Sequence, residues 1–442
     1  MANKLSSGLT QEQMAEYHLD TLANGLRLVT VPMDHLHSAE MVVYVAVGGR
    51  HETEEESGIA HFLEHMLFRG TAEFATSAEL EQAFESIGGA INASTDAETT
   101  CFHSRLHPDH LTEGVALFAS MLRRPSFNDI DIERRIILEE AQEDFNEHGV
   151  QINPDNLMVE LLWPDHPLGQ SLIGTEKSIS AIGLQQLRQF YSLNYTPENI
   201  LLCCCGPLDR ANLLRQVEAE LGDWQGKAPA PPLSAPQSKI KGPKITWVKD
   251  SDSQISIQLA FRLPGRDDPR ILQLRILRRL LSWGGNARLT LRLREKLGLT
   301  YAVDANCSLL ADTGYLAIDL AVRPDNLLPA VRELLLVLDE LRQTQIPQEE
   351  LSNTLRSYLF DLDFARDEPE SQSIRYGWGL QANYLCTLEK ERQDLLQLTP
   401  EKLQKTACEL LQANQLGLVI IGPWEPSDQP EINKILKTFQ QK

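Results

Sequence analysis

One stretch near the middle of the chain divides it into two halves. Proline, alanine and serine gather in the segment Lys227–Pro243, which reads KAPAPPLSAPQSKIKGP. This composition is typical of an extended linker, because few of its residues can join a packed core and several interrupt helices and strands. With 442 residues, the chain is long enough for two domains with separate cores. The sequence therefore predicts an N-terminal domain over 1–227, a linker over 228–243 and a C-terminal domain over 244–442.

The two predicted domains repeat one order of elements. A β-rich run at Ala39–Val47 precedes an apolar helical stretch from about Gly58 to Phe68, and in the second half Gln254–Leu263 precedes Arg270–Ser282. Each half continues with a helix, a glycine-containing turn, two strands and further helices. The matching pieces are Glu79–Ile87, Ala90–Ser94 and Thr100–Leu106 in the first half, and Arg288–Leu297, Tyr301–Ser308 and Gly314–Val322 in the second. This order indicates an α+β fold of two homologous domains, each with a mixed sheet rich in antiparallel pairs and with helices packed on one face.

The charge balance limits the partners that the chain can have. It carries 62 acidic against 41 basic residues, a formal charge of −21, which argues against nucleic acid and suits basic peptides. No stretch approaches 20 consecutive apolar residues, and the first 20 residues lack the apolar core of a secretory signal. We therefore expect no membrane span and a cytoplasmic location. The seven cysteines, three of them adjacent in the strand-like run Leu201–Cys205, are expected to be reduced thiols packed as small hydrophobic residues.

All eleven histidines lie in the first half of the chain, and the densest group is the segment 61–65, HFLEH. On an α-helix His61 and His65 lie one turn apart on the same face, so they can offer two nitrogens to one ion. Glu64 leans over that face, where a carboxylate can take a proton from a water molecule that zinc acidifies to a pKa of about 7. The alternative is a pair of hydrogen-bonded core histidines. Burying two imidazoles and a carboxylate together is costly, however, unless a metal or another partner compensates.

A catalytic zinc ion commonly takes a third protein ligand, and the acidic helix expected over Ile130–Asn146 offers one. Glu133 and Glu140 are seven residues apart and share a face, whereas Glu139 is rotated by about 100° from Glu140. The pattern favours Glu140 as the ligand with Glu133 supporting it, and it fits a merely solvated acidic face about as well. Glu143 is a further candidate ligand.

At these residues the chain resembles the inverzincin peptidases, the family of pitrilysin, insulin-degrading enzyme and the mitochondrial processing peptidase. In that family H-x-x-E-H is followed by a glutamate ligand after about 75 residues, and here Glu140 lies 75 residues after His65 (140 − 65 = 75). The resemblance implies one zinc ion per chain held by His61, His65 and Glu140. It also implies Glu64 as the general base and Glu133 as a supporting acid beside the site.

A second segment of the first half also resembles this family. Gly88–Phe102, which reads GGAINASTDAETTCF, is similar to the family's active-site strand, with Asn92 and Ala93 at the matching positions. That strand binds an extended peptide by adding it to the edge of a sheet. Without the resemblance, the segment is an ordinary hairpin. His166 lies in a further family-like segment, His166–Gly169, and is expected to have no ligand role.

In the second half, Arg292–Val303 (RLREKLGLTYAV) resembles the family's element of paired arginine and tyrosine. The resemblance implies that Arg294 and Tyr301 hold the substrate carbonyl or stabilise the oxyanion of the tetrahedral intermediate. The alternative is a helix end with Arg294 on the surface and Gly298 as its cap.

Members of this family enclose a closed chamber with four homologous units, and this chain supplies two of them. The resemblance therefore implies a homodimer, with a heterodimer containing a related half-length subunit as the alternative. We expect a zinc metalloendopeptidase that hydrolyses peptides or unfolded segments inside this chamber. The other candidates are a precursor-peptide maturase acting with a partner subunit, a non-catalytic structural or chaperone-like subunit, and a zinc hydrolase that is not a peptidase.

Overall fold

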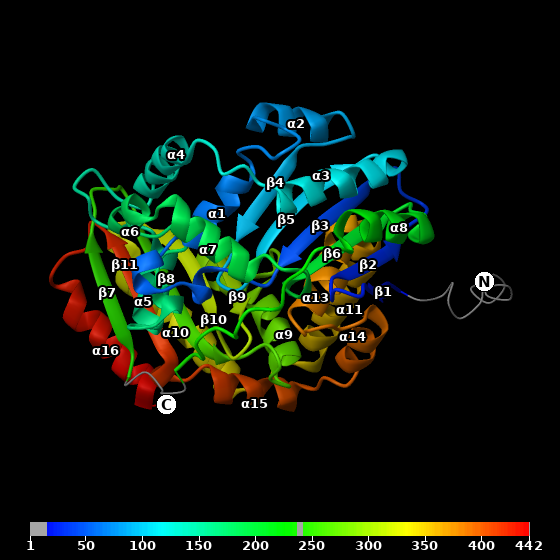
Figure 1. Ribbon diagram of the computed structural model, residues 1–442. Coiled ribbons are helices and arrows are strands. Elements are labelled where there is room, and N and C mark those ends of the chain that lie inside the picture. Colours follow the sequence, from blue (N-terminus) through cyan, green and yellow to red (C-terminus); the bar gives the residue numbers. More distant parts are fainter. Residues whose placement is uncertain (1–15, 237–241, 442) are drawn as a thin grey trace, which may run out of the picture.

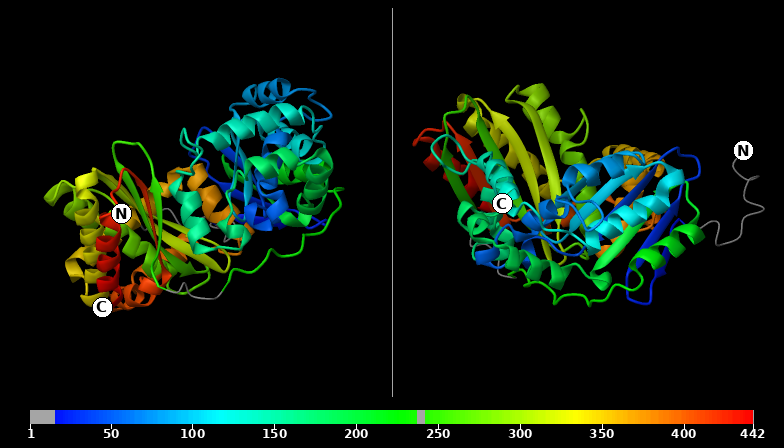
Figure 2. Two further views of the ribbon diagram at one scale, coloured as in Figure 1. Left: turned by 90° about the vertical axis from the view of Figure 1, so that its left-hand side faces the viewer. Right: turned by 45° about the horizontal axis from the view of Figure 1, so that its top comes forward.

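The computed structural model describes residues 16–236 and 242–441. The predicted linker 228–243 therefore lies partly outside the described residues, at 237–241, and so do the ends of the predicted domains at 1–15 and 442. Each half of the chain forms one sheet with helices against it. The two halves lie side by side, and the described part of the linker, drawn in green, runs along the bottom of the left view in Figure 2.

The first half contains a six-stranded sheet in the order β1-β2-β6-β3-β5-β4 (Figure 1). Strands β2 and β6 are parallel and every other pair is antiparallel. The strands are β1 (His18–Thr21), β2 (Arg27–Pro32), β3 (Ala39–Val45), β4 (Ile91–Thr95), β5 (Thr100–Leu106) and β6 (Ile200–Gly206). The helices are α1 (Ile59–Leu67), α2 (Ser77–Glu85), α3 (Leu111–Arg123), α4 (Ile130–Gln142), α5 (Pro154–Leu162), α6 (Glu176–Ala181), α7 (Leu184–Asn194) and α8 (Arg210–Leu221).

The second half contains a five-stranded sheet in the order β7-β11-β8-β10-β9, in which only β7 and β11 are parallel. Its strands are β7 (Lys244–Lys249), β8 (Ile255–Pro264), β9 (Thr300–Leu309), β10 (Thr313–Val322) and β11 (Leu416–Gly422). The α-helices are α9 (Ile271–Ser282), α10 (Leu327–Gln343), α11 (Gln348–Phe364), α12 (Pro369–Gln372), α13 (Gly379–Gln381), α14 (Leu388–Leu395), α15 (Pro400–Leu410) and α16 (Asp428–Gln441). Two segments, η7 (Thr290–Lys296) and η10 (Ser373–Trp378), are π-helical.

The two sheets confirm the repeat that the sequence predicts. The order β2-β6-β3-β5-β4 corresponds strand by strand to β7-β11-β8-β10-β9, with the parallel pair in the same place. Strand β1 is the addition in the first half. One detail differs from the expectation: within the predicted helix Arg288–Leu297, residues 290–296 wind as a wider π-helix. Apolar periodicity does not distinguish the two kinds of turn.

Each half covers the second face of the other half's sheet. Strands β3 and β6 are buried at every residue, because helices of the first half cover one face and part of the second half covers the other. That part is η10, whose Tyr376 packs among residues of β2, β3 and β6. In return, α5 of the first half packs its Met158 and Leu162 against β8 and β11. The two halves therefore share two small cores in addition to their own.

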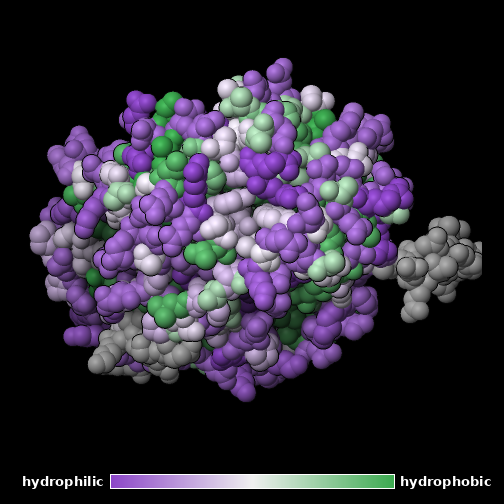
Figure 3. Space-filling view, in the orientation of Figure 1, coloured by the Kyte–Doolittle hydropathy of each residue, from purple (hydrophilic) through white to green (hydrophobic). Residues whose placement is uncertain are grey.

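The surface is mainly polar. On the face shown in Figure 3, hydrophilic residues predominate and hydrophobic ones are scattered in small groups. Within residues 16–236 and 242–441, no helix combines the length and the apolar character that crossing a membrane requires.

Candidate metal centre

Helix α1 presents the predicted zinc-binding residues at the surface of the first half. Its apolar side chains, among them Phe62, Leu63 and Met66, are fully buried against the sheet. Because His61 and His65 are four residues apart, both project from the side of the helix that these residues leave uncovered. Their rings meet edge to face, with centroids 4.5 Å apart.

The structure brings Glu140 to these two histidines from helix α4. The Nε2 atoms of His61 and His65 are 3.1 Å apart, and each lies 3.7 Å from an oxygen of Glu140. In a tetrahedral site with bonds of about 2.0–2.1 Å, ligand atoms are separated by about 3.3 Å. The three side chains therefore form a group that can hold a metal ion, as the sequence predicts. In the described part of the chain it is the only such group of three or more histidine, cysteine or acidic side chains.

The electrostatics of the group fit a divalent cation. Burial, together with the neighbouring imidazole, lowers the pKa of His61 to about 4, so this ring is neutral at pH 7 and its nitrogens can act as ligands. Its Nδ1 is buried without a hydrogen-bond partner. Burial also opposes a proton on His65, but the hydrogen bond of Glu133 and the charges of Glu64 and Glu140 outweigh it and raise the pKa. Carboxylates thus surround two facing nitrogens, an arrangement that zinc would stabilise.

Glu133 supports the site from the same helix as Glu140. Its Oε1 lies 2.8 Å from Nδ1 of His65, and its other oxygen accepts a hydrogen bond from Arg69. Burial would raise the pKa of Glu133, but His65 and Arg69 outweigh it and lower the pKa. A carboxylate at Nδ1 fixes the ring so that Nε2 faces the metal position. Glu139 and Glu143 are exposed, and neither belongs to the metal-binding group.

Glu64 is buried beside the metal-binding group and, among the described residues, accepts a side-chain hydrogen bond from one donor. Its side chain accepts a hydrogen bond of 2.5 Å from the hydroxyl of Thr95 at the end of β4, and burial raises its pKa. A carboxylate whose pKa is raised toward neutrality is suited to accept and return a proton.

The predicted peptide-binding residues lie on an edge strand. Asn92 and Ala93 belong to β4, which among the described strands pairs with β5 alone and ends the sheet. Strand β4 also packs against α1. A peptide added to this edge would therefore run beside the helix that carries the metal-binding residues.

Arg294 and Tyr301 lie against each other in the second half. The guanidinium of Arg294 lies over the ring of Tyr301 at 5.2 Å, and Tyr301 is 84% exposed. Among the described residues, neither side chain forms a hydrogen bond or ion pair with His61, Glu64 or Glu140. Both belong to the second half, at η7 and the start of β9.

Two neighbours of the site were not identified from the sequence. Thr95 lies one residue beyond the strand expected over Ala90–Ser94, and only the packing of β4 on α1 reveals its bond to Glu64. Arg69 could have been identified from the sequence, because it lies four residues after His65 and therefore near the same face of the helix. His166 is buried, and its Nδ1 accepts a hydrogen bond from the backbone of Leu168.

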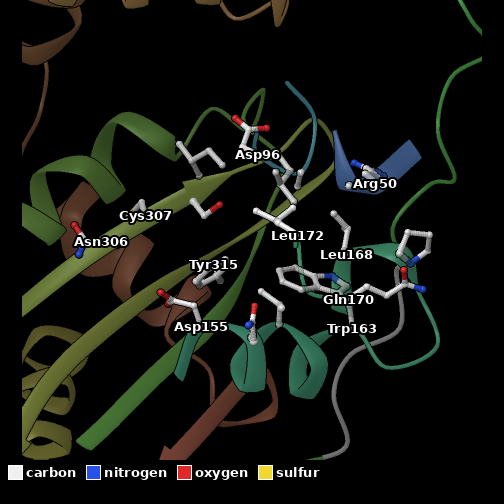
Figure 4. Close-up of a pocket in the computed structure, with 18 of the residues that line it drawn as sticks. Arg50, Asp96, Asp155, Trp163, Leu168, Gln170, Leu172, Asn306, Cys307 and Tyr315 are labelled. Carbon is white, nitrogen blue, oxygen red and sulfur yellow. The ribbon is translucent and has the colours of Figure 1, made fainter. Parts of the chain in front are cut away.

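A separate cavity of about 660 Å³ lies between the two halves (Figure 4). Residues of the first half, such as Arg50 and Trp163, face Asn306, Cys307 and Tyr315 of the second half across it. None of the predicted site residues lines this cavity.

Known proteins are similar to this chain over most of its length. Residues 28–176 match the family described as Insulinase (Peptidase family M16), and residues 181–358 match the domain described as Peptidase M16 inactive domain. An uncharacterized zinc protease of Mycobacterium tuberculosis is 30% identical over 91% of this chain and 92% of its own length. The zinc protease YmxG of Bacillus subtilis, also uncharacterized, is 28% identical over 81% of this chain and 86% of its own length.

Solved structures show the same fold. A protease from Helicobacter pylori superposes with a TM-score of 0.84 at 23% identity, covering 92% of this chain and 99% of its own. A structure described as a peptidase M16 inactive domain, from Pseudomonas fluorescens, gives 0.82 at 23% identity over 93% and 100%. Two matched domains that together span most of the chain, and a relative of this identity and coverage, settle the family: the chain belongs to peptidase family M16, the insulinase family.

Proposed function

We propose that this chain is a zinc-dependent metalloendopeptidase that hydrolyses peptides or unfolded segments and holds one zinc ion. The observation that carries the proposal is the convergence of His61, His65 and Glu140 next to the buried carboxylate of Glu64. Relatives named zinc proteases support zinc as the metal. When bound, zinc would supply Lewis-acid chemistry, lowering the pKa of water and polarising a carbonyl group.

The chain's own side chains would position and move a proton. Glu64 would accept the proton of the attacking water and deliver it to the leaving amine. The Thr95 hydroxyl donates to one oxygen of Glu64, which limits its rotation and leaves the other oxygen to receive the proton. Glu133 and Arg69 hold the ring of His65 in place. These contacts fix the catalytic geometry before substrate binds.

The substrate would bind as an added strand along β4, where Asn92 and Ala93 lie. The outer edge of β4 is free of any described strand. Backbone hydrogen bonds along an edge depend little on sequence, which suits a peptidase that accepts extended peptides or unfolded segments. The net charge of −21 favours basic peptides among them.

A second copy of the chain would complete the site. Arg294 and Tyr301 are exposed, and so are two large apolar residues nearby in sequence, Trp283 and Leu297. This half therefore presents several large side chains to which another subunit could bind. The metal-binding half exposes Glu54 and Glu55 of the acidic run Glu54–Glu56, which has the complementary charge to Arg294. A homodimer could then place the arginine and tyrosine of one copy at the metal centre of the other, where they would stabilise the oxyanion. A related half-length subunit could take the same place.

The direct test is hydrolysis of an internally quenched peptide library by the purified, zinc-loaded chain. We expect turnover, with Glu64→Gln lowering it at least about 10³-fold while zinc content stays at one per chain. Wild-type chain that binds zinc and cleaves no peptide in the library would contradict the proposal.

The dimer has its own test. Glu64→Gln and Tyr301→Phe, each inactive alone, are mixed and allowed to exchange subunits. If each copy completes the other's site, mixed dimers contain one site with both residues intact, and about a quarter of the wild-type turnover returns when exchange is complete. No recovery, despite exchange shown by native mass spectrometry, would contradict completion by a second copy.

The second candidate is a non-catalytic subunit with a structural or chaperone-like role. The match of residues 181–358 to a domain described as inactive favours it. The metal-binding group, however, lies wholly within residues 28–176, in the other matched domain. A maturase that trims a precursor peptide with a partner subunit differs in specificity only, and cleavage of many unrelated peptides by the chain alone would argue against it. The cytoplasmic location stays a prediction.

A further inference from the structure

Arg50 joins both halves of the chain and the linker at one point. Its side chain is 2% exposed. One terminal nitrogen donates to Glu98 in the β4–β5 turn at 2.6 Å, and the other donates to Asp312 in the β9–β10 turn of the second half at 2.8 Å. The guanidinium also donates twice to the backbone carbonyl of Leu233 in the linker. A buried arginine with paired charges on two sides holds its partners in one geometry.

The second half contributes a further arginine to the same junction. Arg266 donates to the other oxygen of Glu98 at 2.6 Å, so this carboxylate lies between two arginines. Asp312 also accepts a hydrogen bond from the backbone of Ala235 in the linker. The turn that follows the predicted peptide-binding strand is therefore tied to the second half and the linker together.

Two residues after Arg50, Glu52 holds the first turn of α1. Its carboxylate accepts hydrogen bonds of 2.8 Å from the backbone N–H groups of Gly58 and Ala60. Gly58 has no side chain that could cap the helix, so Glu52 supplies that cap from the preceding segment. Glu52 is buried, at 4% exposure. His61 follows Ala60 directly.

The segment Gly48–Thr53 thus connects the interdomain junction to the helix that carries the metal-binding residues. Its backbone is also fixed to the β4–β5 turn, since the N–H groups of Gly49 and Arg50 donate to the carbonyls of Asp96 and Ala97. Figure 4 shows Arg50 and Asp96 on neighbouring segments at the same side of the interdomain cavity. Contacts to the same junction consequently fix the positions of both helix α1 and strand β4.

We propose that Arg50 and Glu52 are positioning residues through which the second half of the chain sets the placement of α1 against β4 and α4 within the same chain. The second half has no histidine and matches a domain described as inactive. In this proposal it influences the geometry of the metal centre in the same chain without contacting the metal-binding residues. This inference rests on the proposed function for its effect on turnover, but its effects on zinc affinity and helix stability do not depend on catalysis.

The test compares two arginines that both bind the second half. Arg50→Met removes the junction, whereas Arg27→Met removes the hydrogen bonds of Arg27 to Leu380 and Gln381, which do not involve the Gly48–Thr53 segment. Three quantities are measured on the full chain: amide hydrogen exchange of α1, the zinc Kd in competition with a chromogenic chelator, and kcat and KM on a quenched peptide. We expect Arg50→Met to speed exchange at the start of α1 and to raise the zinc Kd, each about tenfold.

With saturating zinc, kcat should fall about tenfold or more in Arg50→Met while KM changes less than about twofold, because the reacting groups are misplaced and the edge strand still binds peptide. Arg27→Met should leave all three quantities within about twofold of wild type. Should Arg50→Met fail to fold, Asp312→Asn weakens the same junction from the second half and leaves the pair of Arg50 with Glu98.

A direct link between junction and helix is checked with Glu52→Gln. The amide can still accept one of the two backbone hydrogen bonds, so exchange at Gly58 or Ala60 should rise, and combining it with Arg50→Met should add less than the sum of the single effects. The inference is overturned if Arg50→Met and Arg27→Met change exchange and zinc affinity equally. It is also overturned if Arg50→Met lowers thermal stability and leaves the exchange of α1 and the zinc affinity unchanged. If wild-type chain cleaves no peptide, the proposed function fails, while exchange and zinc affinity still decide this inference.

Discussion

Helices α1 and α9 occupy equivalent places in the two halves, yet their polar residues differ in kind: histidines and a glutamate in α1, arginines in α9. Each follows the equivalent buried strand, β3 or β8, and each buries four apolar residues at the same spacing: Phe62, Leu63, Met66 and Leu67 in α1, and Ile276, Leu277, Leu280 and Leu281 in α9. With these residues aligned, Arg275, Arg278 and Arg279 stand where the first half has His61, Glu64 and His65.

The partners of these residues also correspond. Glu133 and Glu140 reach the histidines from α4, and Asp361 reaches Arg279 from α11, at 2.7 Å. Both arrangements place carboxylates of a later helix against a polar strip of the buried helix. In the second half the arginines themselves supply the positive charge, whereas in the first half a metal ion held by the two imidazoles would supply it. The comparison teaches that one frame can support a metal site or an ion-pair network, depending on three side chains.

The largest expected effect comes from removing a ligand in one half and its counterpart in the other. His65→Ala should lower zinc content from one per chain to nearly none and turnover by at least about 10³-fold, because one of three ligands is lost. Arg279→Ala should keep one zinc per chain, as Arg279 contacts Asp361, Ser357 and the rings of Trp283 and Tyr358, all in the second half. Metal analysis of both purified variants checks this. Normal zinc content in His65→Ala would invalidate the assigned site.

A smaller effect concerns acid stability and belongs to the second half alone. Glu391 is 1% exposed and pairs with Arg275 and Arg375, which also lies near Cys386. Burial opposes its ionisation, but Arg375, Arg275 and the hydrogen bond from Tyr358 outweigh it and lower its pKa from the ordinary 4.5. A lowered native pKa stabilises the folded state fully above the unfolded value, and this stabilisation disappears as pH falls through the native pKa.

Glu391→Gln should therefore cost about 3 kcal/mol of unfolding free energy at pH 7, since two half-buried arginines lose their shared buried partner. The difference from wild type should shrink steadily below pH 4.5. Denaturant unfolding followed at pH 7 and at several acid values measures it. Zinc content should not change. A difference that is independent of pH would show that Glu391 stabilises the fold by packing and not by charge.

Much of this architecture follows from local patterns. Alternating and continuous apolar runs locate β3, β5 and β8 to within two residues. Burial of one sheet face requires alternating apolar residues, and burial of both faces requires a continuous apolar run. The i, i+4 histidines place two ligands by geometry alone. Glu140 is less determined by pattern, since a shared face with Glu133 suits a solvated helix equally, and the structure confirms only that it meets the histidines.

Contacts between distant segments could not be predicted in this way. The exchange of α5 and η10 between the halves depends on how two sheets face each other, and no periodicity in either segment records it. The junction around Arg50 joins residues 262 positions apart in sequence. Similarly, the resemblance assigned roles to Arg294 and Tyr301 without showing that the guanidinium of Arg294 lies over the ring of Tyr301. Such facts belong to the tertiary arrangement.

The exchanged segments η10 and α5 can be compared most closely, because each makes a close contact at a glycine, Gly377 in η10 itself and Gly417 of β11 opposite α5. A Cβ on Gly377 of η10 would lie 2.7 Å from a ring carbon of Tyr44 and 2.8 Å from Cβ of Cys203. A Cβ on Gly417 of β11 would lie 2.9 Å from the sulfur of Met158 on α5. The first two neighbours are held rigidly, since Tyr44 bonds to Ser373 and Cys203 lies in a buried strand. Met158 is unbranched and can rotate away.

Gly377→Ala should therefore destabilise the chain by about 1–3 kcal/mol, the usual cost of overpacking, even though alanine favours a helix over glycine by about 1 kcal/mol. Gly417→Ala should stay within about 1 kcal/mol of wild type, because alanine also suits a strand better than glycine and the methionine yields. Thermal unfolding of both variants at pH 7 measures the difference. If Gly417→Ala were the more damaging, the contact between α5 and the second sheet would be the stiffer of the two, and the halves would be held together chiefly by the segment that the first half contributes.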